Sequence, residues 1–166
     1  MKVRAYVLLV FAGILTMSAS TKKASLSEGN TPGNLAPRIE SMDNGREVRF
    51  QNHSGKYTLL NFWAAYDAES RARNIQLWNE VNKLNSSEIE MISISYDKSP
   101  SVFSETVKAD GLNQENQFRD EQGAESEMYK KYGMKKGFKN FLINEKGVIV
   151  AVKKKKKNLP EELRKD

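Results

Sequence analysis

The feature that most constrains the fold is a strand–helix–strand pattern in the middle of the chain. Residues 57–63, Tyr-Thr-Leu-Leu-Asn-Phe-Trp, are mostly apolar without regular alternation, which is typical of a strand buried on both faces. Residues 69–85 follow with apolar side chains at spacings of three and four, which predicts an amphipathic helix. Residues 91–96 form a second apolar strand. Strands joined through a helix pair in parallel, so the pattern predicts an α/β fold.

The flanking segments extend this pattern to a mixed sheet. Asp43-Asn44-Gly45 lies between two short strand-like segments, and Asn-Gly favours the tight turn of a hairpin. Two strands near the C-terminus, joined by a turn at 144–147, predict antiparallel pairing. We expect a mixed central sheet flanked by helices on both faces, with an N-terminal β-hairpin extension. The further helices are expected at 100–111, 125–132 and 159–165, and a polar loop at 112–123.

The N-terminus has the pattern of a secretory signal. Lys2 and Arg4 precede an uncharged stretch, Ala5–Met17, and three small residues follow it. This stretch is shorter than the roughly 20 residues that span a bilayer, so we expect no transmembrane span in the mature chain. The predicted organisation is a signal peptide at 1–20, a linker at 21–37 and one domain at 38–166. Cleavage after residue 18, 19 or 20 stays open, and the alternative is an uncleaved leader. The protein is expected to be exported to the periplasm or cell envelope.

The absence of cysteine limits the available chemistry. Without cysteine the chain has no disulfide, thiolate nucleophile, iron–sulfur cluster or cysteine-type zinc site. The single histidine, His53, is too few for a usual transition-metal site. We therefore expect neither a metal nor a cofactor.

Several short motifs resemble one family. They are Ala36-Pro37, Gly55-Lys56, Leu59-Leu60-Asn61-Phe62-Trp63-Ala64, and Phe141-Leu142-Ile143-Asn144 followed by Gly147. Together they resemble the extracytoplasmic TlpA/ResA-type thiol–disulfide oxidoreductases of the thioredoxin-like superfamily, from about residue 34 onward. The resemblance implies a thioredoxin-like fold.

The positions that carry the family's chemistry differ. The resemblance places its two cysteines on Asp67 and Ser70, and its cis-proline near Phe138. It therefore implies the fold without the thiol–disulfide oxidoreductase activity. A helix N-terminus stabilises a carboxylate as it stabilises a thiolate, so we expect Asp67 to cap the helix, with Glu69 and Ser70 in its first turn.

Two functions remain open. The first is a redox-inactive binding or scaffolding protein of the bacterial cell envelope, whose unknown partner contacts Tyr66, Asp67, Glu69, Ser70 and Arg71. The second is an enzyme, either a non-thiol oxidoreductase or a hydrolase, that uses Asp67, Glu69 or Ser70. A serine nucleophile needs a base within hydrogen-bond reach, and nothing in the sequence brings His53 to Ser70. A pocket with convergent polar groups beside Asp67 would favour the enzyme, and an exposed flat or apolar face the binding protein.

Charge is distributed unevenly along the chain. Residues 130–166 contain 13 basic and 4 acidic residues, whereas residues 21–129 contain 12 basic and 17 acidic residues. The basic excess includes the run Lys153, Lys154, Lys155, Lys156 and Lys157. This run either protects a strand edge from aggregation or binds an anionic surface or acidic partner. We expect no nucleic-acid partner, because no basic face interleaved with aromatic residues is evident.

Overall fold

A computed structural model describes residues 26–39, 48, 50, 55–84 and 88–153. Its centre is a five-stranded sheet in the order β3-β2-β1-β4-β5. β1 pairs with β2, and β2 with β3, in parallel, whereas β4 is antiparallel to both β1 and β5. The strands are β1 (Tyr57–Trp63), β2 (Ile89–Ser95), β3 (Gln117–Arg119), β4 (Asn140–Ile143) and β5 (Ile149–Lys153), and the α-helices are α2 (Ala68–Val81), α3 (Pro100–Ala109) and α4 (Glu127–Lys131).

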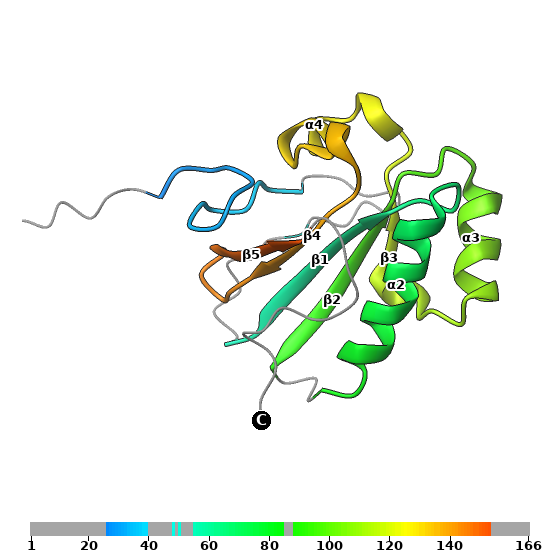
Figure 1. The fold of residues 1–166 in the computed structure, drawn as a ribbon, viewed down its shortest axis with the longest axis horizontal. Coiled ribbons are helices and arrows are strands. Elements are labelled where there is room, and N and C mark those ends of the chain that lie inside the picture. Colours follow the sequence, from blue (N-terminus) through cyan, green and yellow to red (C-terminus); the bar gives the residue numbers. More distant parts are fainter. Residues whose placement is uncertain (1–25, 40–47, 49, 51–54, 85–87, 154–166) are drawn as a thin grey trace, which may run out of the picture.

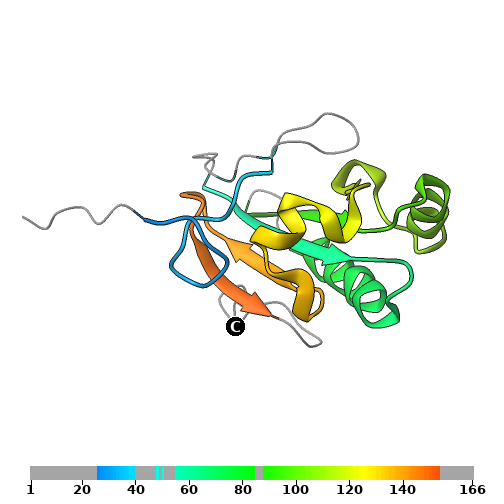
Figure 2. The same ribbon diagram turned by 90° about the horizontal axis from the view of Figure 1, so that it is seen from above.

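Helices cover both faces of the sheet (Figures 1 and 2), with α2 and α3 on one face and α4 on the other. Successive side chains of a strand point to opposite faces, and β1 shows this directly. Leu60 and Phe62 join the core on the α4 face, whereas Leu59 and Trp63 join the clusters beneath α2 and α3. All four are fully buried, which explains why the sequence of β1 lacks polar alternation.

A row of polar side chains crosses the sheet beneath α2. Asn61, Ser93 and Gln117 lie side by side on β1, β2 and β3, and Asn74 of α2 reaches all three. Asn74 Oδ1 accepts hydrogen bonds from Asn61 Nδ2 (2.9 Å) and Ser93 Oγ (2.6 Å), and its Nδ2 donates to Gln117 Oε1 (3.1 Å). Asn74 is fully buried. Because buried polar groups need partners, this row fixes the position of α2 on the sheet.

The N-terminal segment is attached to the same sheet. Gly33 N donates to Ile149 O (2.8 Å), and Ile149 N donates to Asn34 O (2.9 Å), so residues 33–34 hydrogen-bond to the start of β5. The predicted hairpin is described only at its antiparallel Ile39–Val48 bridge, because its turn lies outside the described residues. Among the described residues no helix is long and apolar enough to cross a membrane.

The predicted α/β architecture is confirmed, with two differences in detail. The expected loop at 112–123 contains β3 and a short 3-10 helix, η1 (Gln114–Asn116), and a second one, η2 (Gly123–Glu125), begins at its last residue. A third 3-10 helix, η3 (Met134–Lys136), lies within the expected connection before β4. β3 has only three residues, too few to show a periodic pattern. The predicted signal peptide and the helix at 159–165 lie outside the described residues.

Candidate functional site

The site that the sequence singles out is formed by the turn from β1 into α2 and by the segment before β4. We call residues 64–73 together with Phe138 the β1–α2 corner. Asp67 N donates to Ala64 O (3.1 Å), which closes the turn. The Asp97 carboxylate accepts from Ala65 N through both oxygens (3.0 and 2.9 Å) and from Ser95 Oγ (2.6 Å). Asp97 is 3% exposed, so a buried carboxylate at the end of β2 holds the turn in place.

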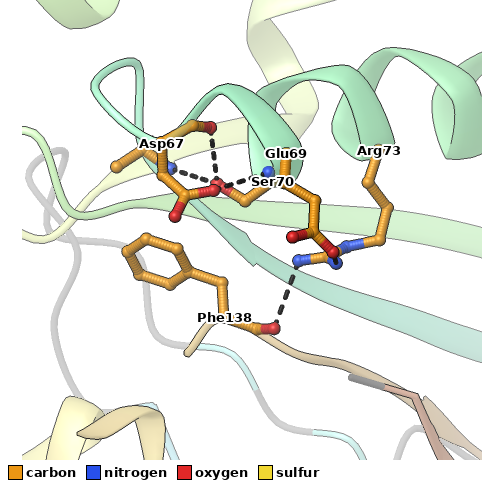
Figure 3. A network of polar contacts seen from close by, with 6 residues as sticks. Asp67, Glu69, Ser70, Arg73 and Phe138 are labelled. Atoms are coloured by element: carbon orange, nitrogen blue, oxygen red, sulfur yellow. Dashed lines mark hydrogen bonds and ion pairs between the residues drawn. The ribbon is translucent and has the colours of Figure 1, made fainter. Parts of the chain in front are cut away.

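Asp67 and Ser70 are bound to each other (Figure 3). Asp67 is the N-cap of α2, and its Oδ1 accepts from Ser70 N at 2.7 Å. Ser70 Oγ donates to Asp67 O (3.1 Å) and accepts from Ala64 N (3.2 Å). The predicted cap is therefore confirmed. Ser70 is 1% exposed and its hydroxyl donates to a carbonyl, so it is not poised as a nucleophile.

Arg71 is held by a two-point ion pair. Its Nε and one terminal nitrogen donate to the two oxygens of Asp110, at 2.8 and 2.6 Å. Asp110 follows α3, so the pair ties the start of α2 to the end of α3. The hydrogen bond with Asp110 raises the pKa of Arg71 further. The guanidinium therefore helps to hold α2 against α3, although it is partly accessible to solvent.

Arg73 lies on the buried side of the corner and binds the segment before β4. Its guanidinium donates to Phe138 O at 3.2 Å and lies 3.9 Å from Glu69 Oε1 (Figure 3). Burial lowers the pKa of Arg73, and the Glu69 and Asp67 carboxylates oppose this. The carboxylate of Glu69 remains largely exposed, so it is the most exposed charge of the corner.

An aromatic stack joins the exposed surface of the corner to the core. Tyr66 is 73% exposed, and its ring lies 6.3 Å from that of Phe138. Phe138 in turn stacks on buried Tyr96, with ring centroids 5.8 Å apart and planes at 10°. Partial burial raises the pKa of the Tyr66 hydroxyl, as do Tyr129, Asp97 and Asp67. Tyr66 is therefore a neutral aromatic side chain supported from below, an arrangement suited to binding.

The structure brings together Tyr66, Asp67, Glu69, Ser70 and Arg71 at one helix start, as the sequence analysis expects. It adds Asp97 and Arg73, which that analysis missed. Asp97 comes directly after the predicted strand at 91–96. Residues at the carboxyl ends of parallel strands often line binding sites, so this position could have marked Asp97 as a site residue. Arg73 gave no such signal, because helical spacing alone does not show which polar residue faces inward.

Other predicted site residues lie apart from this corner. Lys153 ends β5, and Lys154–Lys157 and His53 lie outside the described residues. Within the described part of the chain no group of three or more acidic or histidine side chains is placed to hold a metal ion.

The capping role of Asp67 can be tested by replacement. Asp67→Ala removes the acceptor for Ser70 N, so we expect the free energy of unfolding to fall by about 0.5–2 kcal/mol. Asp67→Asn should retain much of this stability, because its amide oxygen accepts the same bond. Urea unfolding at neutral pH measures both. A neutral or stabilising alanine would show that the carboxylate is strained rather than capping, which would favour a catalytic role.

Comparison with known proteins agrees with the resemblance drawn from the motifs. The model of the AhpC/TSA family matches residues 32–152. A thioredoxin-like protein from Parabacteroides distasonis is 59% identical in sequence, with a TM-score of 0.72 over 77% of this chain and 90% of that chain. A thiol-disulfide oxidoreductase from Bacteroides fragilis is 30% identical, with a TM-score of 0.57 over 72% of this chain and 89% of that one. No curated protein matches the chain. The chain therefore belongs to the AhpC/TSA family and has the thioredoxin-like fold.

Proposed function

We propose that this protein is a redox-inactive member of its family that binds a partner protein through the β1–α2 corner. The observation that carries the proposal is the mutually bonded cap formed by Asp67 and Ser70, at the two positions where the family resemblance places the thiols. A dithiol exchange reaction requires a thiolate nucleophile, and the sequence contains no cysteine. The corner nevertheless exposes Tyr66, and it also exposes Glu69 in the first turn of α2.

The binding surface has the composition of a small protein-binding site. Aromatic residues supported by packed neighbours contribute strongly to protein interfaces, because they bury a large area with little loss of side-chain freedom. Tyr66 meets this description, since its ring packs against that of Phe138 in a tilted contact, with centroids 6.3 Å apart. The exposed Glu69 carboxylate would favour a partner that places a basic or hydrogen-bonding group beside the aromatic contact.

The alternative, an enzyme acting through Asp67, Glu69 or Ser70, has less support. Asp67 and Ser70 satisfy each other, and the Ser70 hydroxyl is buried. The Glu69 side chain is 64% exposed, so its carboxylate is open to water rather than held in an enclosed site that could position a substrate. The corner therefore supports binding better than catalysis.

The proposed location is the periplasm or cell envelope. The N-terminal sequence supports export through its charged start, uncharged stretch and small residues.

A second contact of the protein there is an anionic surface bound by Lys153–Lys157, which the basic excess of residues 130–166 favours. Such binding should disappear in molar salt, where the Debye length falls to about 3 Å. Equal retention on anionic and neutral vesicles at low salt would leave these lysines only the role of edge protection.

The binding role of Tyr66 can be tested by site-specific crosslinking. A photoreactive phenylalanine analogue at position 66 should capture a discrete partner in the native envelope. The same analogue at Val102, an exposed apolar residue of α3, is the matched control and should capture none. Tyr66→Ala should weaken co-purification of that partner about 5- to 30-fold, equivalent to about 1–2 kcal/mol. Its stability should change by less than about 0.5 kcal/mol, because the side chain is exposed.

Two results would contradict the proposal. One is equal capture from positions 66 and 102, which would indicate random collisions. The other is unchanged co-purification of the partner by Tyr66→Ala.

A further inference from the structure

The segment that leads from the middle of α4 to β4 carries a strong excess of positive charge. Residues 128–139 contain five lysines and no acidic residue. Three of these lysines are held by neighbours within the protein: Lys130 by Glu127 (3.7 Å), Lys131 by Glu28 (3.9 Å) and Lys139 by the carbonyl oxygen of Tyr132 (3.3 Å). Lys135 and Lys136 are exposed and make no ion pair with any residue that the structure describes. We call these two residues the lysine pair.

The lysine pair lies on η3, which is a tightly held turn. Gly133 and Gly137 flank η3 with φ angles of 67° and 102°, a backbone conformation that residues with a side chain rarely adopt. Gly137 N donates to Met134 O (2.9 Å), which closes the turn, and Met134 is 1% exposed within the core. The buried methionine anchors η3, so the turn presents the two lysines that follow it at a defined place on the surface.

The chain on both sides of the lysine pair leads to aromatic rings. Tyr129 lies in α4 before η3, and Phe138 comes two residues after Lys136. Both rings are half-buried and pack against Tyr96, with centroids 5.1 and 5.8 Å from it. Phe138 also contacts the exposed ring of Tyr66, 6.3 Å away. We call Tyr66, Phe138 and Tyr129 the aromatic strip, and the lysine pair lies at its edge, on the connection between α4 and β4 (Figure 1).

The lysine pair restricts the charge of a partner that covers the aromatic strip. Such a partner also displaces water from the two ammonium groups, and a desolvated charge is costly without an opposite charge beside it. Carboxylates of the partner would offset this cost and would attract the partner before contact, whereas a basic segment would be repelled. Glu69, the most exposed carboxylate of the corner, lies 3.9 Å from Arg73 and makes no ion pair with the lysine pair.

We propose that the partner of the β1–α2 corner presents an acidic segment to Lys135 and Lys136, next to an aromatic or large apolar residue that packs on the aromatic strip. This inference rests on the proposed binding function and names the chemistry of its partner, a peptide segment that contains aspartate or glutamate. The aromatic strip supplies the contact area, and the lysine pair supplies attraction and orientation.

Selection of binders from a displayed library of random short peptides, with the full chain as the target, tests the proposal. Enriched peptides should combine an aromatic or large apolar residue with more than one acidic residue. Their binding should weaken as NaCl is raised to about 1 M, because the Debye length falls to about 3 Å there.

Variants assign the binding to the lysine pair. Lys135→Glu with Lys136→Glu should weaken the selected peptides at least about tenfold, because two attractive contacts become repulsive. Lys135→Gln with Lys136→Gln only removes the charges and should have a smaller effect. Lys83→Glu with Lys146→Glu is the matched control. Both of these lysines are exposed, one just after the end of α2 and the other in the turn between β4 and β5, so the control should bind as the unmodified protein does.

Tyr66→Ala separates this inference from the proposed function. Peptides that require Tyr66 but lack acidic residues, or that bind the charge-reversed variant equally well, would overturn the inference and leave binding at the corner in place. A selection without any Tyr66-dependent peptide would contradict both. Binding of anionic vesicles that needs the lysine pair but not Tyr66 would assign the pair to a lipid surface and would also overturn the inference.

Discussion

The hydrogen bond from Ser70 N to the Asp67 carboxylate sets the geometry of the β1–α2 corner. It begins α2 at a defined residue, because the carboxylate takes one of the N–H groups that a helix start leaves unpaired. The following turn of the helix then directs Arg71 to Asp110 and Arg73 to the carbonyl of Phe138. A change at the cap would therefore affect contacts with both α3 and the segment before β4.

The corner has a helix start where the family resemblance places a dithiol, but its residues make structural contacts instead. A helix N-terminus favours any anion, so an aspartate is accommodated where relatives with this motif place a thiolate. Phe138, near which the family resemblance places a proline, has an aromatic ring that stacks on Tyr96 and contacts Tyr66. The buried Asn74 hydrogen bonds hold α2 against three strands at once, which keeps this surface rigid. A rigid, aromatic surface suits recognition without chemistry.

Much of this arrangement could be predicted from the sequence. The apolar segment Tyr57–Trp63 identified β1 at its observed bounds, and the position of Asp67 before an amphipathic helix identified the cap. β3 was missed because three residues show no periodicity. Asn74 and Arg73 were missed because their burial depends on polar partners from distant strands and segments.

We propose that the corner serves binding, and that restoring the thiols alone does not restore the thiol–disulfide reaction. The most direct measurement is the insulin-reduction rate of the Asp67→Cys, Ser70→Cys double variant, compared with a cysteine-containing relative and with a triple variant that adds Phe138→Pro. We predict that the double variant stays far below the relative, because Phe138, which is bonded to Arg73, lies near the position where the family resemblance places the substrate-binding proline. The triple variant should recover part of the rate. A double variant as fast as the relative would contradict the claim, because it would show that only the two thiols separate this corner from a working thiol–disulfide site.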